Sequence, residues 1–446
     1  MSQSRGSDKS VKNIFVVGLD ELNKSLLKTV PHAQYYRFHS LFTFDEVVHP
    51  DGPFDVAKAC KKAEAWLAAC EHRPDAIVGY WDFPTSTMLP ILRENAGLPS
   101  PSLESILRLE HKLWARLQHQ KVVPHLTPKF AAFDPFSIES DEALPLYYPF
   151  WIKPIRSHSS FLGFRIDKRQ AFEDALEKIR ERIQFVGKPF NQIMERADLP
   201  SEIRAVDGYH CIAEEIISDG RQCTAEGYVS NGRIVVYGIV DSHREGKHRS
   251  SFQRYQYPSS LPMSVQEEIS AASEAVVHAS GYDNAPFNVE FFWDEDSERL
   301  SLLEVNARIS KSHSPLFQMV DGVSHHHVMI ETALGQEPHL PHRQGRFRMA
   351  AKFMLRRYSD AVVKRIPNQE DIDRVQARYP EALVRIMVKE GQRLSRLAWQ
   401  DAYSFEFAEL FLGANSEKEL LDKYQKTRAM LGFDFENEGT LDEIAH

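Results

Sequence analysis

In PFNVEFFWDEDSERLSLLEVNARISKSHSPL, residues 286–316, an acidic turn separates two apolar runs that read as strands. Each run nonetheless contains one acid, Glu290 in NVEFF and Glu304 in LLEVN. Two bare carboxylates on one sheet face would repel each other and lose hydration, at a cost of several kcal/mol. A cation held between them would remove that cost, so the pattern indicates a functional site.

Two further polar residues follow Glu304 in alternation. Asn306 lies two residues beyond Glu304 and Arg308 two residues further on, so on a strand their side chains point to the same face. Carboxylate and amide oxygens are ligands that suit Mg²⁺, and an arginine can hold a phosphate or a carboxylate in a fork. We therefore predict that Glu290, Glu304 and Asn306 bind a metal. The alternative, half-exposed strands whose acids face water, explains the full combination less well.

The composition is that of an ordinary globular protein and argues against a nucleic-acid-binding, secreted or membrane-spanning protein. The 446 residues are 42% hydrophobic and 26% charged, with a formal net charge of −9 and no long basic run, which argues against nucleic acid as a partner. The four cysteines have no metal-type spacing and are expected to be reduced thiols. The start MSQSRGSDKS lacks the apolar segment of a signal peptide, and no apolar run approaches the roughly 18 residues that span a bilayer. We expect a cytoplasmic protein with no membrane partner.

Alternating strands and helices near the N-terminus predict a parallel sheet. Apolar strands are expected at residues 13–19, 33–41 and 74–80, with helices at 24–30 and 54–73. The whole chain is predicted to combine α/β and α+β architecture. Its expected parts are a flexible tail at 1–11, an N-terminal α/β domain at 12–120, a two-part α+β domain at 121–335 and a C-terminal α+β lobe at 336–446.

Three local predictions concern elements near the site. Residues 102–120 are expected to form one helix that begins with a capping box at Ser102. Asn231-Gly232 between apolar runs predicts a tight hairpin turn. Residues 241–262 are rich in His, Arg and Lys and are interpreted as a mobile lid over the substrates, with a solvated basic loop as the alternative.

The stretch 286–316 resembles the metal-binding end of the ATP-grasp superfamily, and further segments follow in that family's order. Lys112 in LRLEHKLWARL resembles the family's first phosphate lysine, and Lys153 in PFWIKPIRSHSSFLGFRI resembles the second. The resemblance covers about residues 13–335 and implies an ATP-grasp fold with a Rossmann-like N-terminal domain. CIAEEIISDGRQCTAEGYV resembles the strand that receives adenine, which implies nucleotide contacts at Glu214, Glu215, Ile216 and Ile217.

Two features depart from the family pattern. The phosphate loop RSHSSFLG holds one glycine, Gly163, where the family is rich in glycine, so the hydroxyls of Ser159 and Ser160 are expected to donate to phosphates instead. Gln222 stands where the family commonly has an acid, which leaves Glu226 as the acid expected at the nucleotide. With these departures we still expect nucleotide binding, but the rate of turnover is expected to depend on them.

The resemblance implies an ATP-dependent ligase of the carboxylate–amine type. With ATP and Mg²⁺ (or Mn²⁺) it would activate a carboxylate as an acyl phosphate, an amine would then form an amide or peptide bond, and Arg308 would hold the carboxylate or its oxyanion. Small-molecule carboxylates and amines would be the partners, and relatives favour a homodimer. The C-terminal lobe is similar in kind to that of L-amino-acid ligases and biotin-carboxylase-like members. Two alternatives stay open: a carboxylase that uses ATP and bicarbonate, and a nucleotide-binding regulator without catalysis.

Overall fold

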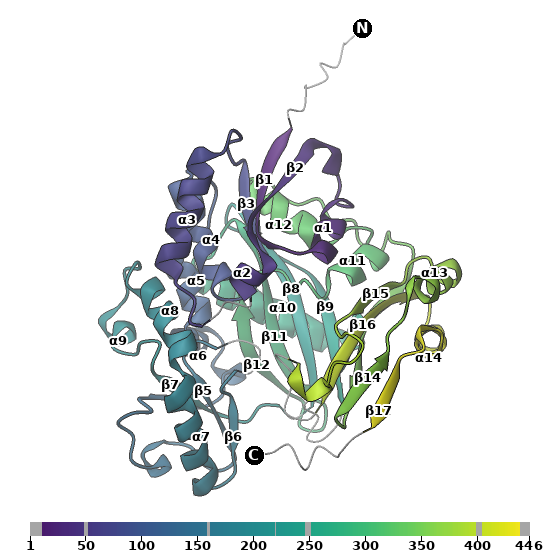
Figure 1. Cartoon of the computed structure of the whole chain (residues 1–446). Coiled ribbons are helices and arrows are strands. Elements are labelled where there is room, and N and C mark those ends of the chain that lie inside the picture. Colours follow the sequence, from purple (N-terminus) through teal and green to yellow (C-terminus); the bar gives the residue numbers. More distant parts are fainter. Residues whose placement is uncertain are drawn as a thin grey trace.

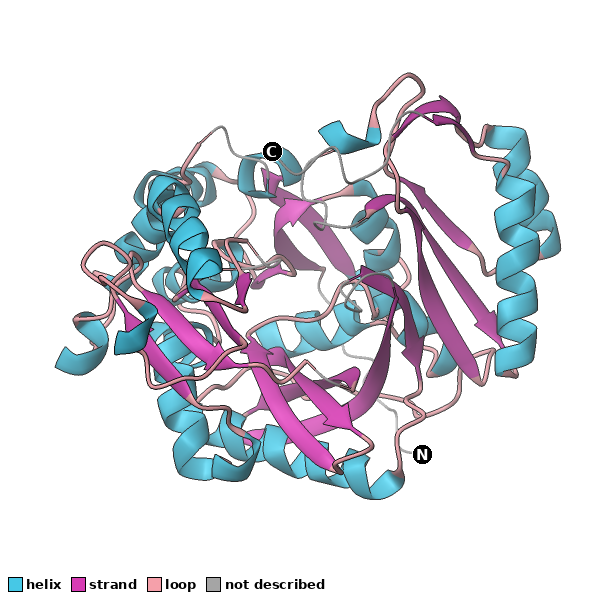
Figure 2. Cartoon of the chain, turned by 90° about the horizontal axis from the view of Figure 1, so that it is seen from below, coloured by secondary structure: helices cyan, strands magenta, loops and turns pink. Residues whose placement is uncertain are grey.

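The computed structural model of the chain describes residues 11–48, 52–157, 161–218, 220–245, 251–397 and 404–437. Helices pack against the sheets on several sides, as two perpendicular views show (Figure 1) (Figure 2). Among the described helices, none is long and apolar enough to cross a membrane.

The N-terminal sheet is parallel, as the alternation of strands and helices predicts. Its elements are β1 (Lys12–Leu19), α1 (Glu21–Leu27), β2 (Tyr36–Thr43), α2 (Phe44–Val48), α3 (Val56–Ala69), β3 (Ala76–Gly79) and α4 (Thr85–Asn95). The strand order is β2-β1-β3, and both neighbours run parallel to β1. Phe15 and Val17 of β1 pack into one apolar cluster while Ile14 and Val16 pack into another, because a parallel sheet needs cover on both faces.

The prediction of one helix over residues 102–120 is wrong, because the segment forms two helices. They are α5 (Leu103–Glu110) and α6 (Lys112–Val122). His111 between them is extended, and its Nδ1 accepts a hydrogen bond from the backbone N of Trp114 at 3.3 Å, which caps α6. At the start of α5 the Ser102 side chain accepts from the backbone N of Ser105, so Ser102 is a cap without a capping box. The break makes Lys112 the first residue of a helix.

A four-stranded antiparallel sheet follows. It has the order β4-β7-β5-β6. The elements are β4 (Phe130–Phe133), β5 (Phe150–Pro154), β6 (Phe164–Ile166), α7 (Arg169–Arg182), α8 (Gln184–Met194), α9 (Ser201–Arg204) and β7 (Cys211–Glu215). The apolar core of this unit includes Phe150 and Ile152 of β5 packed with Phe172 and Ile179 of α7.

The largest sheet has eight strands in the order β12-β11-β8-β9-β10-β13-β16-β15. These strands are β8 (Arg221–Ser230), β9 (Arg233–Glu245), β10 (Ser251–Tyr257), β11 (Ala285–Asp294), β12 (Arg299–Asn306), β13 (Met349–Arg357), β15 (Leu383–Ile386) and β16 (Phe405–Ala414). Pairing of β10 with β13 carries the sheet from the segment 121–335 into the segment 336–446. The division into domains therefore stays a prediction, because one sheet spans the expected boundary near residue 336.

The remaining elements are helices and two strands, which form a separate two-stranded antiparallel sheet. They are α10 (Met263–Ser280), α11 (Ser314–Val320), α12 (His325–Ala333), β14 (Ala361–Arg365), α13 (Gln369–Arg378), α14 (Glu417–Leu431) and β17 (Asp434–Asn437), with 3₁₀ turns at Ala33–Tyr35, Pro124–Leu126, Asp141–Ala143 and Leu394–Arg396. In Figure 1, α12 lies behind the N-terminal strands, and its Met329 and Ile330 pack with Ile14 and Val16 of β1.

The hairpin between β8 and β9 is confirmed, whereas the lid prediction is largely wrong. Asn231 and Gly232 have φ of 50° and 78°, the positive values that a two-residue type I′ turn requires. Most of segment 241–262 belongs to the central sheet, because β9 continues to Glu245 and pairs with β10. His243 and Arg244 are strand residues. The basic residues at 247–249 lie outside the described part of the chain.

Candidate active site

The two acids of the opening hairpin meet as predicted. Glu290 of β11 and Glu304 of β12 are register partners, and so are Asn288 and Asn306 two residues along the ladder. The Asn306 amide donates to Glu290 Oε1 at 3.3 Å and to Asn288 Oδ1 at 3.0 Å. Gln222 of β8 donates to Glu290 Oε2 at 2.8 Å. Three strands thus present carboxylate and amide groups on one face of the sheet.

The electrostatics of the pair fit a cation. Burial, and then the nearby Glu304 carboxylate, raise the pKa of Glu290 to about 7, although Arg308 and Arg244 act in the opposite direction. An acid that is hard to ionise because a second carboxylate stands beside it ionises readily once a cation neutralises both. The donor set is made of oxygens only. Glu290, Glu304 and Asn306 could therefore hold a hard divalent ion such as Mg²⁺.

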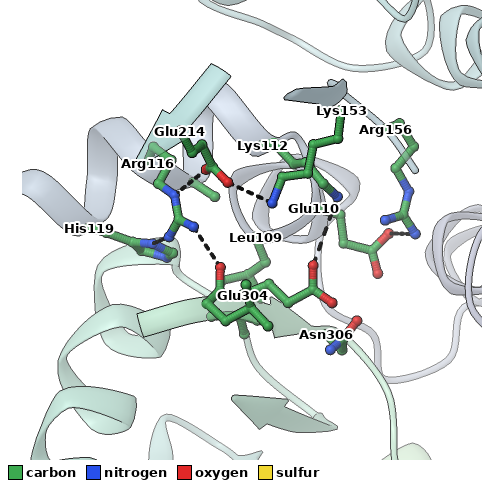
Figure 3. Close-up of a pocket in the computed structure, with 13 residues that line it drawn as sticks. Leu109, Glu110, Lys112, Arg116, His119, Lys153, Arg156, Glu214, Glu304 and Asn306 are labelled. Atoms are coloured by element: carbon green, nitrogen blue, oxygen red, sulfur yellow. Dashed lines mark hydrogen bonds and ion pairs between the residues drawn. The ribbon is translucent and has the colours of Figure 1, made fainter. Parts of the chain in front are cut away.

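Two lysines approach these acids from a second unit. Lys112, at the start of α6, donates to the carbonyl of Ser157 at 3.0 Å and lies 3.9 Å from Glu304 Oε2. Lys153 of β5 lies 2.6 Å from Glu214 Oε2. Figure 3 shows the two lysine side chains between Glu214 on one side and Glu304 on the other. Burial lowers the pKa of Lys112 to about 8, and Lys153 acts in the same direction.

Glu214 forms a buried ion-pair network that the sequence analysis did not foresee. Its Oε1 accepts from Arg116 Nε at 2.6 Å, and burial alone would raise the pKa of Glu214, but Arg116 and Lys153 hold it below its ordinary range. Arg116 also donates to the carbonyls of Leu302 and Leu303 in β12 at 3.0 and 2.8 Å. The signal available in the sequence was spacing, since Arg116 lies four residues after Lys112 on one helix face.

A second unforeseen pair borders the same pocket. Arg156 lies 2.9 Å from Glu110 Oε2, which also accepts from the Ser86 hydroxyl at 2.9 Å. The pocket thus brings together five residues predicted from the sequence and several that were missed (Figure 3). Its lining residues are Leu109, Glu110, Lys112, Ala115, Arg116, His119, Lys153, Arg156, Glu214, Leu303, Glu304, Val305 and Asn306.

Other predicted nucleotide residues lie outside the pocket lining or outside the described part of the chain. Glu215 ends β7, where its backbone N donates to the carbonyl of Lys129 and its carboxylate accepts from the backbone N of Lys129, both at 3.0 Å. Ile216 and Ile217 follow directly. Neither Glu215 nor these isoleucines line the pocket. Ser159 and Ser160 lie outside the described residues, so their predicted contacts stay predictions.

Glu226 occupies a different environment from the one expected. It is fully buried in β8, where its Oε1 lies 2.7 Å from His313 Nδ1 and its Oε2 lies 3.7 Å from His325 Nε2. Tyr237 bonds the other nitrogen of His325 at 2.7 Å. Glu226 does not line the pocket, and a direct contact with a nucleotide there would require this network to open. The network instead ties β8 to the segment that follows β12.

The guanidinium of Arg308 already forms a bidentate ion pair with a carboxylate of the protein. Its Nε and one terminal nitrogen donate to the two oxygens of Asp82 at 2.8 and 2.9 Å, and the other terminal nitrogen donates to the carbonyl of Ile309 at 3.2 Å. Asp82 follows β3 of the N-terminal sheet. The sequence analysis missed it, although loops at the carboxyl ends of parallel strands commonly carry binding residues.

Comparison with known proteins shows which proteins the chain is similar to. Residues 146–315 match the family model of the ATP-grasp domain. Comparison with curated protein sequences gives no match. The chain is structurally similar to the L-amino acid ligase from Bacillus licheniformis, with a TM-score of 0.69 at 16% identity over 96% of this chain and 100% of that chain.

Two further solved structures share the fold. Phosphoribosylglycinamide synthetase from Anaerococcus prevotii gives a TM-score of 0.62 at 13% identity over 95% of this chain and all of that one. Biotin carboxylase from Campylobacter jejuni, in its beta-gamma-ATP complex, gives 0.61 at 14% identity over 98% of this chain and 94% of that chain. Residues 146–315 therefore match the ATP-grasp domain model, and nearly the whole chain shares its fold with these three solved structures.

Proposed function

We propose that the chain is an ATP-dependent ligase that activates a small-molecule carboxylate as an acyl phosphate and transfers the acyl group to an amine, which yields an amide or peptide bond. One observation carries the proposal: Lys112 and Lys153 share a pocket with Glu304 and Asn306 of β12, and Glu304 is the register partner of Glu290 in β11. The chain shares its fold with an L-amino acid ligase and with a biotin carboxylase, so the test below separates the ligase from the carboxylase and from the non-catalytic regulator.

The residues divide the work by charge. Lys112 and Lys153 would each place a mobile positive charge on the phosphates of ATP. Glu290, Glu304 and Asn306 would hold Mg²⁺ (or Mn²⁺), which when bound bridges phosphate oxygens and neutralises their charge. The adenine contact is proposed for the backbone from Glu214 to Ile217, and the loop with Ser159 and Ser160 would cover the phosphates.

The chemistry needs position and electrostatics and no protein nucleophile. An oxygen of the substrate carboxylate attacks the γ-phosphorus of ATP, and ADP leaves. The amine nitrogen then attacks the acyl carbon, the bond to phosphate breaks, and the amine loses a proton. The partners are thus a small-molecule carboxylate and an amine.

Arg308 remains the proposed residue for the developing oxyanion. Since Asp82 already fills its fork, a substrate carboxylate either replaces Asp82 there or binds to another cation. In the first case one carboxylate replaces another at the same guanidinium, so the charge and the hydrogen bonds at Arg308 are conserved.

The test measures ADP release with ATP and Mg²⁺ against a panel of amino acids, hydroxy acids and bicarbonate. We expect ADP release that depends on an organic acid and an amine, and a fall of roughly a hundredfold or more in Glu304→Ala, because loss of a metal ligand removes charge stabilisation. Release that depends on bicarbonate would instead identify a carboxylase. A melting temperature raised by Mg-ATP without any ADP release would identify a regulator and contradict the ligase.

A further inference from the structure

The segment after β12 carries an ammonium group without an anionic partner. Lys311 lies three residues beyond Arg308 and is partly exposed, and its Nζ lies 4.4 Å from the centroid of the Trp81 ring. Within the described part of the chain, no carboxylate lies at ion-pair distance from this nitrogen. A half-buried ammonium group loses part of its hydration, and contact with the face of one aromatic ring recovers only part of that lost free energy.

The cations around Lys311 differ from it in having acids of their own. Arg308 pairs with Asp82, while Lys352 and Arg385 share Glu409 at 2.5 and 3.3 Å. Positive charge is thus in excess at this place. Consistent with that excess, burial and then Lys352 lower the pKa of Lys311 to about 8, and Glu409 opposes the shift.

Three parts of the fold meet at this lysine. Trp81 and Asp82 come from the segment after β3, and Trp81 is itself fixed because its ring N–H donates to the carbonyl of Gly18 at 2.7 Å. Lys352 comes from β13, and its Nζ lies 3.3 Å from the Ser312 hydroxyl next to Lys311. Lys311 therefore lies among neighbours that are held by contacts of their own, five residues beyond Asn306 of the proposed metal set.

We propose that Lys311 binds a carboxylate group of the acid substrate, at a position that leaves the Arg308–Asp82 pair intact. The inference deepens the proposed ligase function and rests on it. An ammonium offers three N–H donors to a carboxylate, and such charge-assisted bonds are among the strongest in proteins. The site is assigned to carboxylates because the acid substrate must lie near the metal-bearing hairpin, whereas the phosphate lysines lie in the pocket beside α6 and β5.

The test is a binding measurement on the full chain that needs no turnover. Thermal unfolding is followed with succinate, L-alanine, the amides succinamide and L-alaninamide, which lack the carboxylate, and inorganic phosphate, each titrated without ATP. The variants are Lys311→Met, Lys311→Gln and the charge-conserving Lys311→Arg. Lys426→Met is the matched control, since Lys426 is half exposed on α14 and pairs with Asp422. A Mg-ATP titration of every variant checks that each is folded and keeps its nucleotide site.

At least one carboxylate should raise the melting temperature of the wild type, Lys311→Arg and the control, while its amide should not. The apparent Kd of that acid should rise roughly ten- to hundredfold in Lys311→Met and Lys311→Gln, which is the usual size of a lost charge-assisted bond. Equal affinity in Lys311→Met and wild type would overturn the inference, and so would a site that accepts phosphate but no carboxylate, or no acid at all. If Mg-ATP alone gives no shift in the wild type, the proposed function fails separately.

Discussion

One proton on Glu290 decides whether the paired acids can receive a cation. Its pKa of about 7, raised by burial and by Glu304, means that near neutral pH the group is only partly ionised without a metal. The proton must leave for the carboxylate to act as a ligand, so affinity for a divalent ion should fall as the pH drops below about 7.

The same shift predicts how metal-free stability depends on pH. In the unfolded chain Glu290 loses its proton near its ordinary pKa of 4.5, but in the folded chain near 7, so between these values the folded state binds more protons and its stability falls as the pH rises. Glu290→Gln keeps an acceptor for Gln222 and removes that penalty. With a chelator present, the variant should be more stable than wild type by roughly 1–3 kcal/mol at pH 8 and nearly equal to it below pH 4.5. Urea denaturation at both pH values checks this, and a pH-independent difference would contradict it.

Arg116 should matter for stability more than any surface charge. Its guanidinium compensates the buried Glu214 and bonds two carbonyls of β12, so Arg116→Met leaves a buried carboxylate with Lys153 alone. We expect a loss of about 3–5 kcal/mol in the free energy of unfolding. Chemical denaturation of this variant is compared with Lys426→Met, which breaks an exposed pair and should cost less than about 1 kcal/mol. Equal losses in the two variants would rule out the buried network as a source of stability.

At the scale of elements, the break between α5 and α6 positions Lys112, which we propose as the first phosphate lysine. His111 caps α6 through Nδ1, and its Nε2 lies 2.8 Å from the carbonyl of Val206, so the neutral ring bonds on both sides. Burial lowers the pKa of His111 to about 4, which keeps the ring neutral at ordinary pH. The break is therefore a built feature of the site and not an irregular helix.

Removing this cap should affect nucleotide binding as well as stability. His111→Ala is expected to lower stability by about 1–2 kcal/mol and to raise the KM for ATP, because the first turn of α6 carries Lys112. His111→Asn can still cap the helix and should recover part of both effects. Thermal unfolding and steady-state kinetics of the two variants give the comparison. An unchanged KM in His111→Ala would mean that the cap does not position the lysine.

At the scale of the whole molecule, the continuous eight-stranded sheet makes the C-terminal part inseparable from the rest. β13 pairs with β10, and Phe347 and Phe411 share an apolar cluster with Tyr257 and Phe317. Removal of residues 336–446 would expose one edge of β10 and part of this cluster, and exposed edges template aggregation. A chain ended at residue 335 should therefore be recovered mainly as aggregate. Gel filtration against the full chain decides the matter, and a monodisperse, Mg-ATP-binding fragment would show that the cluster is dispensable.

Local patterns along the chain determined much of this protein. The alternation of apolar and polar residues predicted the hairpin with its two acids, because side chains alternate between the two faces of a strand. Asn231-Gly232 predicted the turn between β8 and β9, because these residue types readily adopt the positive φ angles that the turn requires. The basic composition of residues 241–262 outweighed a strand pattern in SFQRYQY, and β10 was missed as a result.

Only the tertiary structure decided which charges meet. Arg116 and Glu214 are 98 residues apart, and Arg308 and Asp82 are 226 apart, so no spacing rule connects them. Each pair forms because packing of separate units brings opposite charges together where water is scarce. Lys311, which has no carboxylate at ion-pair distance among the described residues, stands out only against those pairs. The sequence by itself determined the residue types and local geometry of the site. The packing of distant units determined which charged side chains already have an oppositely charged partner in the protein and which can still bind a charged ligand.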